Sequence, residues 1–139
     1  MPGIVGYGVA AARANASMKE RTDKEIAIRD HLIHRIETEI PYVKVNGDRI
    51  KRLPNNVNVS FQFVEGESLL LMLDNYGICA SSGSACTSGS LDPSHVLLAI
   101  GLPHEIAHGS LRMTLSEETF RSGQIERNCS ALKKHVSII

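Results

Sequence analysis

One cysteine, Cys86, lies in a stretch of small, hydroxylated and glycine residues that covers residues 79–93. This stretch has almost no apolar side chain to anchor it in a core, so we expect an exposed loop. A free cysteine is normally a buried small hydrophobe, whereas a thiol in an exposed loop is available to react. The sequence therefore predicts that Cys86 is a nucleophilic thiol rather than an inert loop residue.

A second residue that could do chemistry is Arg112, in a short segment where apolar and polar side chains alternate. A planar guanidinium can bind a carboxylate through two parallel hydrogen bonds, which a lysine cannot reproduce. An arginine in a strand can equally be a surface residue paired with an acidic neighbour. From the residue type alone, both interpretations of Arg112 stay open.

The remaining cysteines and the histidines raise the possibility of a metal site. The residues to consider are Cys79, Cys86, His95, His104 and His108. No Cys-x-x-Cys or His-Glu-x-x-His pairing occurs among them, so we expect no metal. Cys79 ends a short apolar segment and Cys129 lies on the apolar side of the last expected helix, so we expect both thiols to be buried.

Composition limits the classes of function. The chain has 139 residues, enough for one domain with a proper core, and 42% hydrophobic and 22% charged residues are typical of globular proteins. Fifteen basic and fifteen acidic residues cancel, so nothing indicates binding to nucleic acid or to an anionic membrane surface. Three cysteines, an odd number, and no charged-then-apolar leader predict free thiols and a cytoplasmic location.

The first forty residues read as helical. Pro2 can occupy the first turn of an opening helix rich in glycine and alanine. Residues 23–40 predict an amphipathic helix that ends before Pro41. Its expected apolar stripe consists of Ile26, Ile33, Ile36 and Ile40. Its charged residues, expected largely off that stripe, are Lys24, Glu25, Arg29, Asp30 and Glu37.

The rest of the chain alternates short strands and helices. Strands are expected at residues 42–45, 57–63, 78–80 and 110–115, and helices at residues 68–74 and 103–108. A further helix should begin with Asp92 as N-cap and Pro93 at its first position. Ile125, Cys129, Leu132 and Val136 predict a closing helix. We therefore expect an α/β (α+β) two-layer sandwich with a small, mainly antiparallel sheet, helices mostly on one face, and a long helix before it.

Several motifs in register carry a family resemblance. They are Pro2-Gly-Ile-Val-Gly6, Leu53-Pro-Asn-Asn-Val-Asn-Val-Ser-Phe61, Gly66-Glu-Ser-Leu-Leu-Leu71, Ser81-Ser-Gly-Ser-Ala-Cys86-Thr-Ser-Gly, Asp92-Pro-Ser-His-Val-Leu-Leu-Ala-Ile-Gly101 and Ser110-Leu-Arg112. Together they resemble the C-terminal region of cysteine desulfurases of the nitrogen-fixation and iron–sulfur-cluster-assembly type. The likeness covers nearly the whole chain.

The resemblance implies a role for both candidate residues. Members of this family use pyridoxal 5'-phosphate to remove sulfur from L-cysteine, which leaves L-alanine and a persulfide on a loop cysteine. Cys86 would be that cysteine, and Arg112 would bind the α-carboxylate of the substrate. The implied partners are L-cysteine and a sulfur acceptor or iron–sulfur scaffold protein, and the complete enzyme would be a homodimer.

The chain also departs from the family pattern. It contains no Ser-x-His-Lys motif, which carries the cofactor lysine in the family's large domain. The resemblance therefore implies that residues 1–139 are the small C-terminal domain, with residues 1–20 as the interdomain linker helix. Such a chain should bind no cofactor and be inactive alone.

Two other interpretations remain open. One is a non-catalytic domain that carries persulfide sulfur or docks a sulfur acceptor, and the missing lysine motif favours it. The other is a related pyridoxal-phosphate lyase that acts on selenocysteine or cysteine sulfinate.

Overall fold

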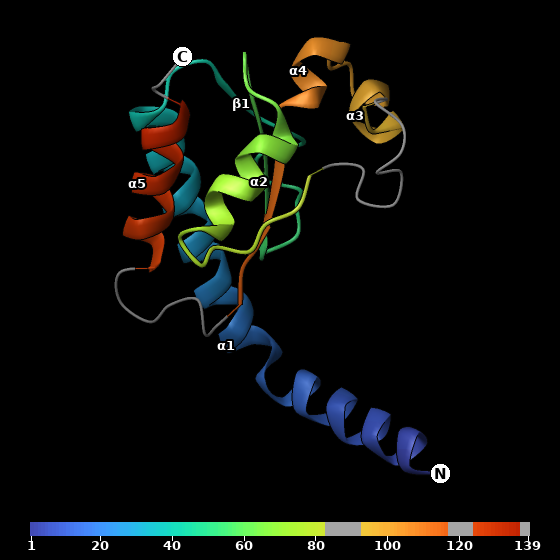
Figure 1. The fold of residues 1–139 in the computed structure, drawn as a ribbon. Helices are drawn as coiled ribbons and strands as arrows, with labels where there is room; N and C mark the ends of the chain where they lie inside the picture. The colour runs from blue at the N-terminus through green and yellow to red at the C-terminus, as the bar shows by residue number, and fades with distance from the viewer. Residues whose placement is uncertain (83–92, 117–123, 137–139) are drawn as a thin grey trace.

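The computed structural model describes residues 1–82, 93–116 and 124–136. Its elements, in chain order, are α1 (Pro2–Glu39), β1 (Val43–Val45), β2 (Asn56–Phe61), α2 (Gly66–Asp74), α3 (His95–Ala99), α4 (His104–His108), β3 (Ser110–Thr114) and α5 (Gln124–Val136). The expected fold class is confirmed: a small antiparallel sheet follows a long helix, and helices pack mainly on one side of the sheet (Figure 1).

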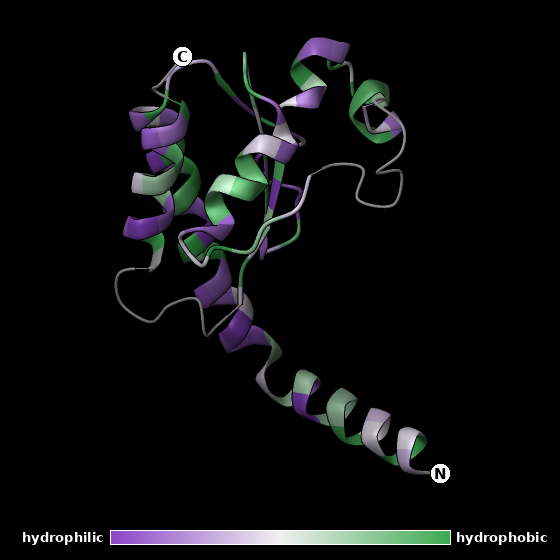
Figure 2. Ribbon diagram, viewed as in Figure 1, coloured by the Kyte–Doolittle hydropathy of each residue, from purple (hydrophilic) through white to green (hydrophobic). Residues whose placement is uncertain are grey.

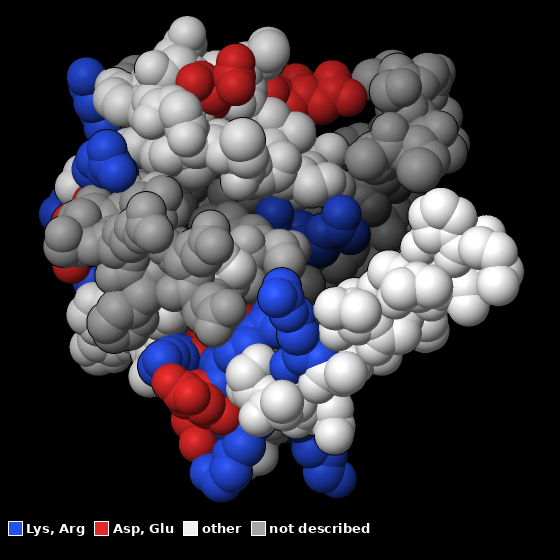
Figure 3. Space-filling view, turned by 90° about the horizontal axis from the view of Figure 1, so that it is seen from below, with Lys and Arg blue, Asp and Glu red and all other residues white. Residues whose placement is uncertain are grey.

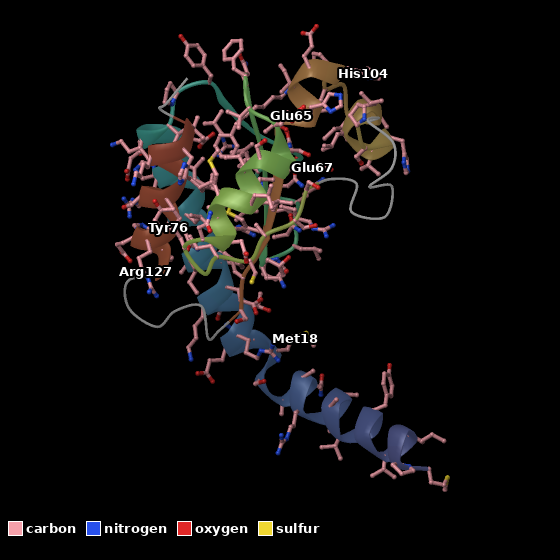
Figure 4. All side chains as sticks on the ribbon, in the orientation of Figure 1. Met18, Glu65, Glu67, Tyr76, His104 and Arg127 are labelled. Atoms are coloured by element: carbon pink, nitrogen blue, oxygen red, sulfur yellow. The ribbon has the colours of Figure 1, made fainter. Side chains whose placement is uncertain are left out.

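The two helices expected in the first forty residues are one continuous helix, α1. Its first part projects from the rest of the chain, and the helix bends near Met18 (Figure 4). At that point the Ser17 hydroxyl donates to the Arg13 carbonyl, 3.1 Å away, a type of hydrogen bond that often bends helices. The helix ends before Pro41 as expected, because Ile40 takes the extended backbone that a following proline favours.

The second part of α1 supplies one wall of the core. Ile33, Ile36 and Ile40 are buried as expected. Glu25 and Arg29, expected off the apolar stripe, are buried as well. Arg29 satisfies its guanidinium through Asp30 and the Leu53 carbonyl, and its long stem packs as an apolar side chain does.

The sheet has the strand order β1-β2-β3, and both pairings are antiparallel. Apolar and polar residues alternate along β2 and β3, so one face is apolar and the other polar. The apolar face consists of Val57, Val59, Phe61, Leu111 and Met113, which are all buried. The second part of α1, α2 and α5 cover this face (Figure 1).

Three expectations about local structure are wrong. The strand expected at residues 57–63 is present as β2, and only its predicted end is wrong: it ends at Phe61, because Phe63 has a positive φ of 66° and is exposed. Residues 78–80 do not form a strand, and only Ser81 pairs there, as an isolated bridge to Arg112. Helix α3 begins at His95 with Ser94 as N-cap, so Pro93 is not its first residue; Asp92 lies outside the described residues.

The closing helix is confirmed as α5, with Cys129, Leu132 and Val136 buried and Ile125 packed against the core. Gly109, before β3, lets two strands approach closely. A Cβ there would lie 1.9 Å from the Phe61 carbonyl oxygen, so no larger residue fits without movement.

The surface carries mixed charge, and the projecting part of α1 carries little. Seen from below, lysine and arginine side chains gather near acidic ones, while the end of the projecting arm shows neither (Figure 3). The residues of that arm are mostly of intermediate or apolar hydropathy. A polar stretch follows where α1 joins the rest of the structure (Figure 2). Among the helices that the structure describes, none combines the length and apolarity needed to cross a membrane.

Candidate functional site

Arg112 lies in the middle of β3, on the polar face of the sheet. Its side chain is exposed, and its Nη2 donates to the Ser81 hydroxyl over 3.3 Å. No ion pair between described residues includes Arg112, so with respect to these residues the guanidinium keeps several donors available. Of the two interpretations of Arg112, the surface ion pair therefore receives no support from the described residues.

Arg112 belongs to a row of polar residues that crosses the sheet. Asn58 on β2 lies directly opposite Arg112, and Asn46, just after β1, donates its backbone N–H to the Asn58 carbonyl. On the other side, Ser81 pairs with Arg112. Opposite residues in antiparallel strands share a face, so Asn46, Asn58, Arg112 and Ser81 form one polar row.

Hydrogen bonds fix the Asn46 end of the polar row. The Asn46 side chain is only 5% exposed, and its Nδ2 donates to Asn58 Oδ1 at 2.6 Å and to Ser60 Oγ at 2.9 Å. Ser60 is fully buried. Because buried polar groups are held by their partners, the carboxamide of Asn58 has a defined orientation.

The Ser81 end of the polar row is also well fixed. Ser81 and Arg112 exchange two backbone hydrogen bonds, with N···O distances of 3.0 Å and 2.6 Å. Ser81 precedes residues 83–92, which include Cys86 and lie outside the described residues. The chain therefore enters the Cys86 segment from a position beside the Arg112 guanidinium.

The two described cysteines differ in their surroundings. Cys129 is buried as expected, and burial raises the pKa of its thiol. Cys79 is exposed, so the expectation of a buried thiol is wrong there. The physical reason is that residues 78–80 do not join the sheet. Cys79 instead lines an open pocket of about 280 Å³ whose rim includes Tyr76 and Arg127 (Figure 4).

The described residues do not fit pyridoxal phosphate. Enzymes that use this cofactor bind it through a lysine, and every lysine of this chain is exposed on the surface. Besides the pocket beside Cys79, there is an open pocket of about 390 Å³. Phe63, Val64, Glu65, Glu105 and His108 line it. Its two carboxylates have the wrong charge for a phosphate group, and the residues that line the pocket beside Cys79 include no lysine.

The metal interpretation receives no support from the described part of the chain. His104 and His108 lie one turn apart on α4, yet no group of three or more potential ligands forms within residues 1–82, 93–116 and 124–136.

Sequence reasoning missed Asn46, Asn58 and Ser81. The alternation in β2 already predicts that Asn58 points away from the core. Its position opposite Arg112 depends on strand register, which the sequence alone does not specify.

Comparison with known proteins gives the family. The family model for class-V aminotransferases matches residues 1–121, which is most of the chain. This chain belongs to that family.

The matched relatives within the family are cysteine desulfurases, as the motifs indicate. A cysteine desulfurase from Nostoc is 51% identical over 127 residues, which cover 91% of this chain and 32% of that protein. The cysteine desulfurase IscS of Clostridium botulinum (strain Hall) is 60% identical over 115 residues, covering 81% of this chain and 29% of that protein. The chain thus corresponds to a portion of the cysteine desulfurases and spans about a third of their length.

A solved structure has the same fold. The NifS-like protein from Rickettsia africae superposes with a TM-score of 0.82 at 26% sequence identity, covering 98% of this chain and 34% of that one. This chain therefore has the fold of about a third of that NifS-like protein.

Proposed function

We propose that this chain is the sulfur-accepting part of a cysteine desulfurase, with Cys86 as acceptor and Arg112 as the residue that binds the substrate carboxylate. One observation carries the proposal: the double backbone pairing of Ser81 with Arg112. Cys86 is five positions after Ser81 in the sequence, a span of at most about 18 Å for extended chain. A thiol on that tether can reach a substrate held at Arg112.

The proposed step moves one sulfur atom and balances without an added oxidant. The Cys86 thiolate attacks the sulfur of L-cysteine, an S–S bond forms and the Cβ–S bond breaks. The carbon retains the electron pair and takes up a proton, so the products are L-alanine and a persulfide on Cys86. The cofactor, bound by a polypeptide outside this chain, supplies the electron sink.

Arg112 suits the proposed role in substrate binding because it is a cation without a carboxylate partner among the described residues. Its link to Ser81 limits the orientations of the side chain, which lowers the entropic cost of binding. Because the chain contains no Ser-x-His-Lys motif and its lysines are all exposed, we propose that it turns over L-cysteine only together with a cofactor-bearing polypeptide. The sulfur would then pass to an acceptor or iron–sulfur scaffold protein.

A second candidate function is a persulfide-carrying domain that receives sulfur but takes no part in breaking the C–S bond. The surface exposure of every lysine and the two carboxylates in the pocket beside His108 favour it, since neither feature suits a pyridoxal-phosphate site.

The test is the intact mass of this chain after incubation with L-cysteine, pyridoxal phosphate and the separately produced cofactor domain of a cysteine desulfurase. We expect a gain of one sulfur atom on Cys86 that requires the cofactor domain. The Cys86→Ser variant should show no gain, and Cys79→Ser is the matched control that should gain normally. No gain in the wild type, with both pieces folded and associated, would contradict the proposal.

A separate persulfide donor distinguishes the second function. If the chain takes up sulfur from an inorganic polysulfide but never from L-cysteine with the cofactor domain, the carrier function is favoured instead.

A further inference from the structure

The carboxamide of Asn58 has a defined orientation. Its Oδ1 accepts a hydrogen bond from Asn46 Nδ2 at 2.6 Å, so the oxygen is turned toward β1. The two branches of a planar carboxamide diverge, so Nδ2 is turned away from Asn46. The hydrogen bonds between described residues leave this Nδ2 donor without an acceptor, although Asn58 is half-buried.

Asn58 and Arg112 are neighbours across the pairing of β2 with β3. Asn58 occupies the central strand, with Asn46 on one side and Arg112 directly opposite on the other. Directly opposite residues of an antiparallel pair have Cβ atoms about 4.5–5.5 Å apart. The Asn58 amide and the Arg112 side chain therefore start from neighbouring positions on one face of the sheet. The guanidinium reaches the Ser81 hydroxyl on the other side of β3 and has no carboxylate partner among the described residues.

A carboxylate is the ligand that suits this pair of donors. It has two oxygens that accept several hydrogen bonds, whereas a cation would be repelled by Arg112 and an apolar group would leave both donors unpaired. The adjacent hydroxyl of Ser81 is already engaged with Arg112 and so leaves the site mainly with donors.

We propose that Asn58 is a second carboxylate-binding residue, which donates through Nδ2 to the same α-carboxylate that Arg112 binds. Asn46 and Ser60 hold it in that orientation. This inference rests on the proposed function of Arg112 and adds a residue that determines specificity. A guanidinium alone attracts any anion, whereas an oriented amide beside it selects a planar acceptor at one position.

The test uses NMR of the isotope-labelled chain, titrated with L-alanine and, as a control, with L-alaninamide, which lacks the carboxylate. We expect L-alanine to shift the Asn58 side-chain NH₂ signals together with the Arg112 Nε–H signal. L-Alaninamide should shift neither. Asn56 is the internal control, because it lies on the same face of β2 but opposite Thr114.

Two variants sharpen the measurement. Asn58→Ala should weaken the affinity for L-alanine about tenfold or more, since a hydrogen bond to a charged group is lost. Asn56→Ala should leave the affinity unchanged.

The failures are distinguishable. If L-alanine shifts Arg112 but not Asn58, the role of Asn58 is refuted while Arg112 keeps its proposed function. If L-alanine shifts neither residue, the carboxylate site is refuted, and the proposed function of Arg112 fails with it.

Discussion

The two faces of the three-stranded sheet differ in composition and in exposure. The covered face consists of aliphatic and aromatic side chains that α1, α2 and α5 remove from water. The other face carries the polar row, in which Arg112 is exposed. The same strands thus supply stability through one set of residues and a binding site through the residues between them. Period-two alternation makes this separation possible, because neighbouring residues in a strand point to opposite faces.

The largest expected effect comes from the covered face. Phe61→Ala should destabilise the chain by about 3–5 kcal/mol, because Phe61 is fully buried and its loss leaves a cavity. Urea unfolding of the isolated chain measures this. The matched control is Phe63→Ala, two residues along, where the side chain is 71% exposed and little should change. Equal effects at the two positions would contradict the burial of Phe61 in the core.

The close approach at Gly109 should give the next largest effect. Gly109→Ala should destabilise the chain by about 1–3 kcal/mol, because its Cβ would meet the Phe61 carbonyl and the backbone must shift. Gly6→Ala is the control: nothing lies within 4 Å of its Cβ in α1, and alanine favours a helix. Thermal unfolding of both variants should show opposite signs, and a tolerated alanine at Gly109 would contradict the close packing.

The smallest expected effect on stability belongs to the polar row. Arg112→Ala should change the free energy of unfolding by less than about 0.5 kcal/mol, since the side chain is exposed and its one side-chain hydrogen bond to a described residue is long. Its neighbour Leu111 is fully buried, so Leu111→Ala should cost about 2–5 kcal/mol. Urea unfolding of this adjacent pair compares the two faces directly. A large loss for Arg112→Ala would mean that the polar face also holds the fold.

Much of the fold could be predicted from local patterns. The periodicity of apolar residues correctly predicted the second part of α1, the strands β1 and β3 and the closing helix α5. The periodicity failed where tertiary contacts determine whether a side chain is buried. Arg29 is buried because Asp30 and the Leu53 carbonyl satisfy its charge, and a helical wheel contains no information about such partners.

The candidate site was predictable only in part. The loop composition singled out Cys86, and the family motifs singled out both Cys86 and Arg112; their roles remain proposals. Cys79 was misjudged because a short apolar run was assumed to form a strand. Asn58 was missed because its importance depends on the residue opposite it.

The sequence by itself determined the elements, the apolar face of the sheet and the membership of the class-V aminotransferase family, since these depend on residue order and local spacing. Only the tertiary structure decided that Asn46, Asn58, Arg112 and Ser81 form one row. Those residues come from four segments of the chain, and strand register, fixed by packing the covered face against the helices, brings them together.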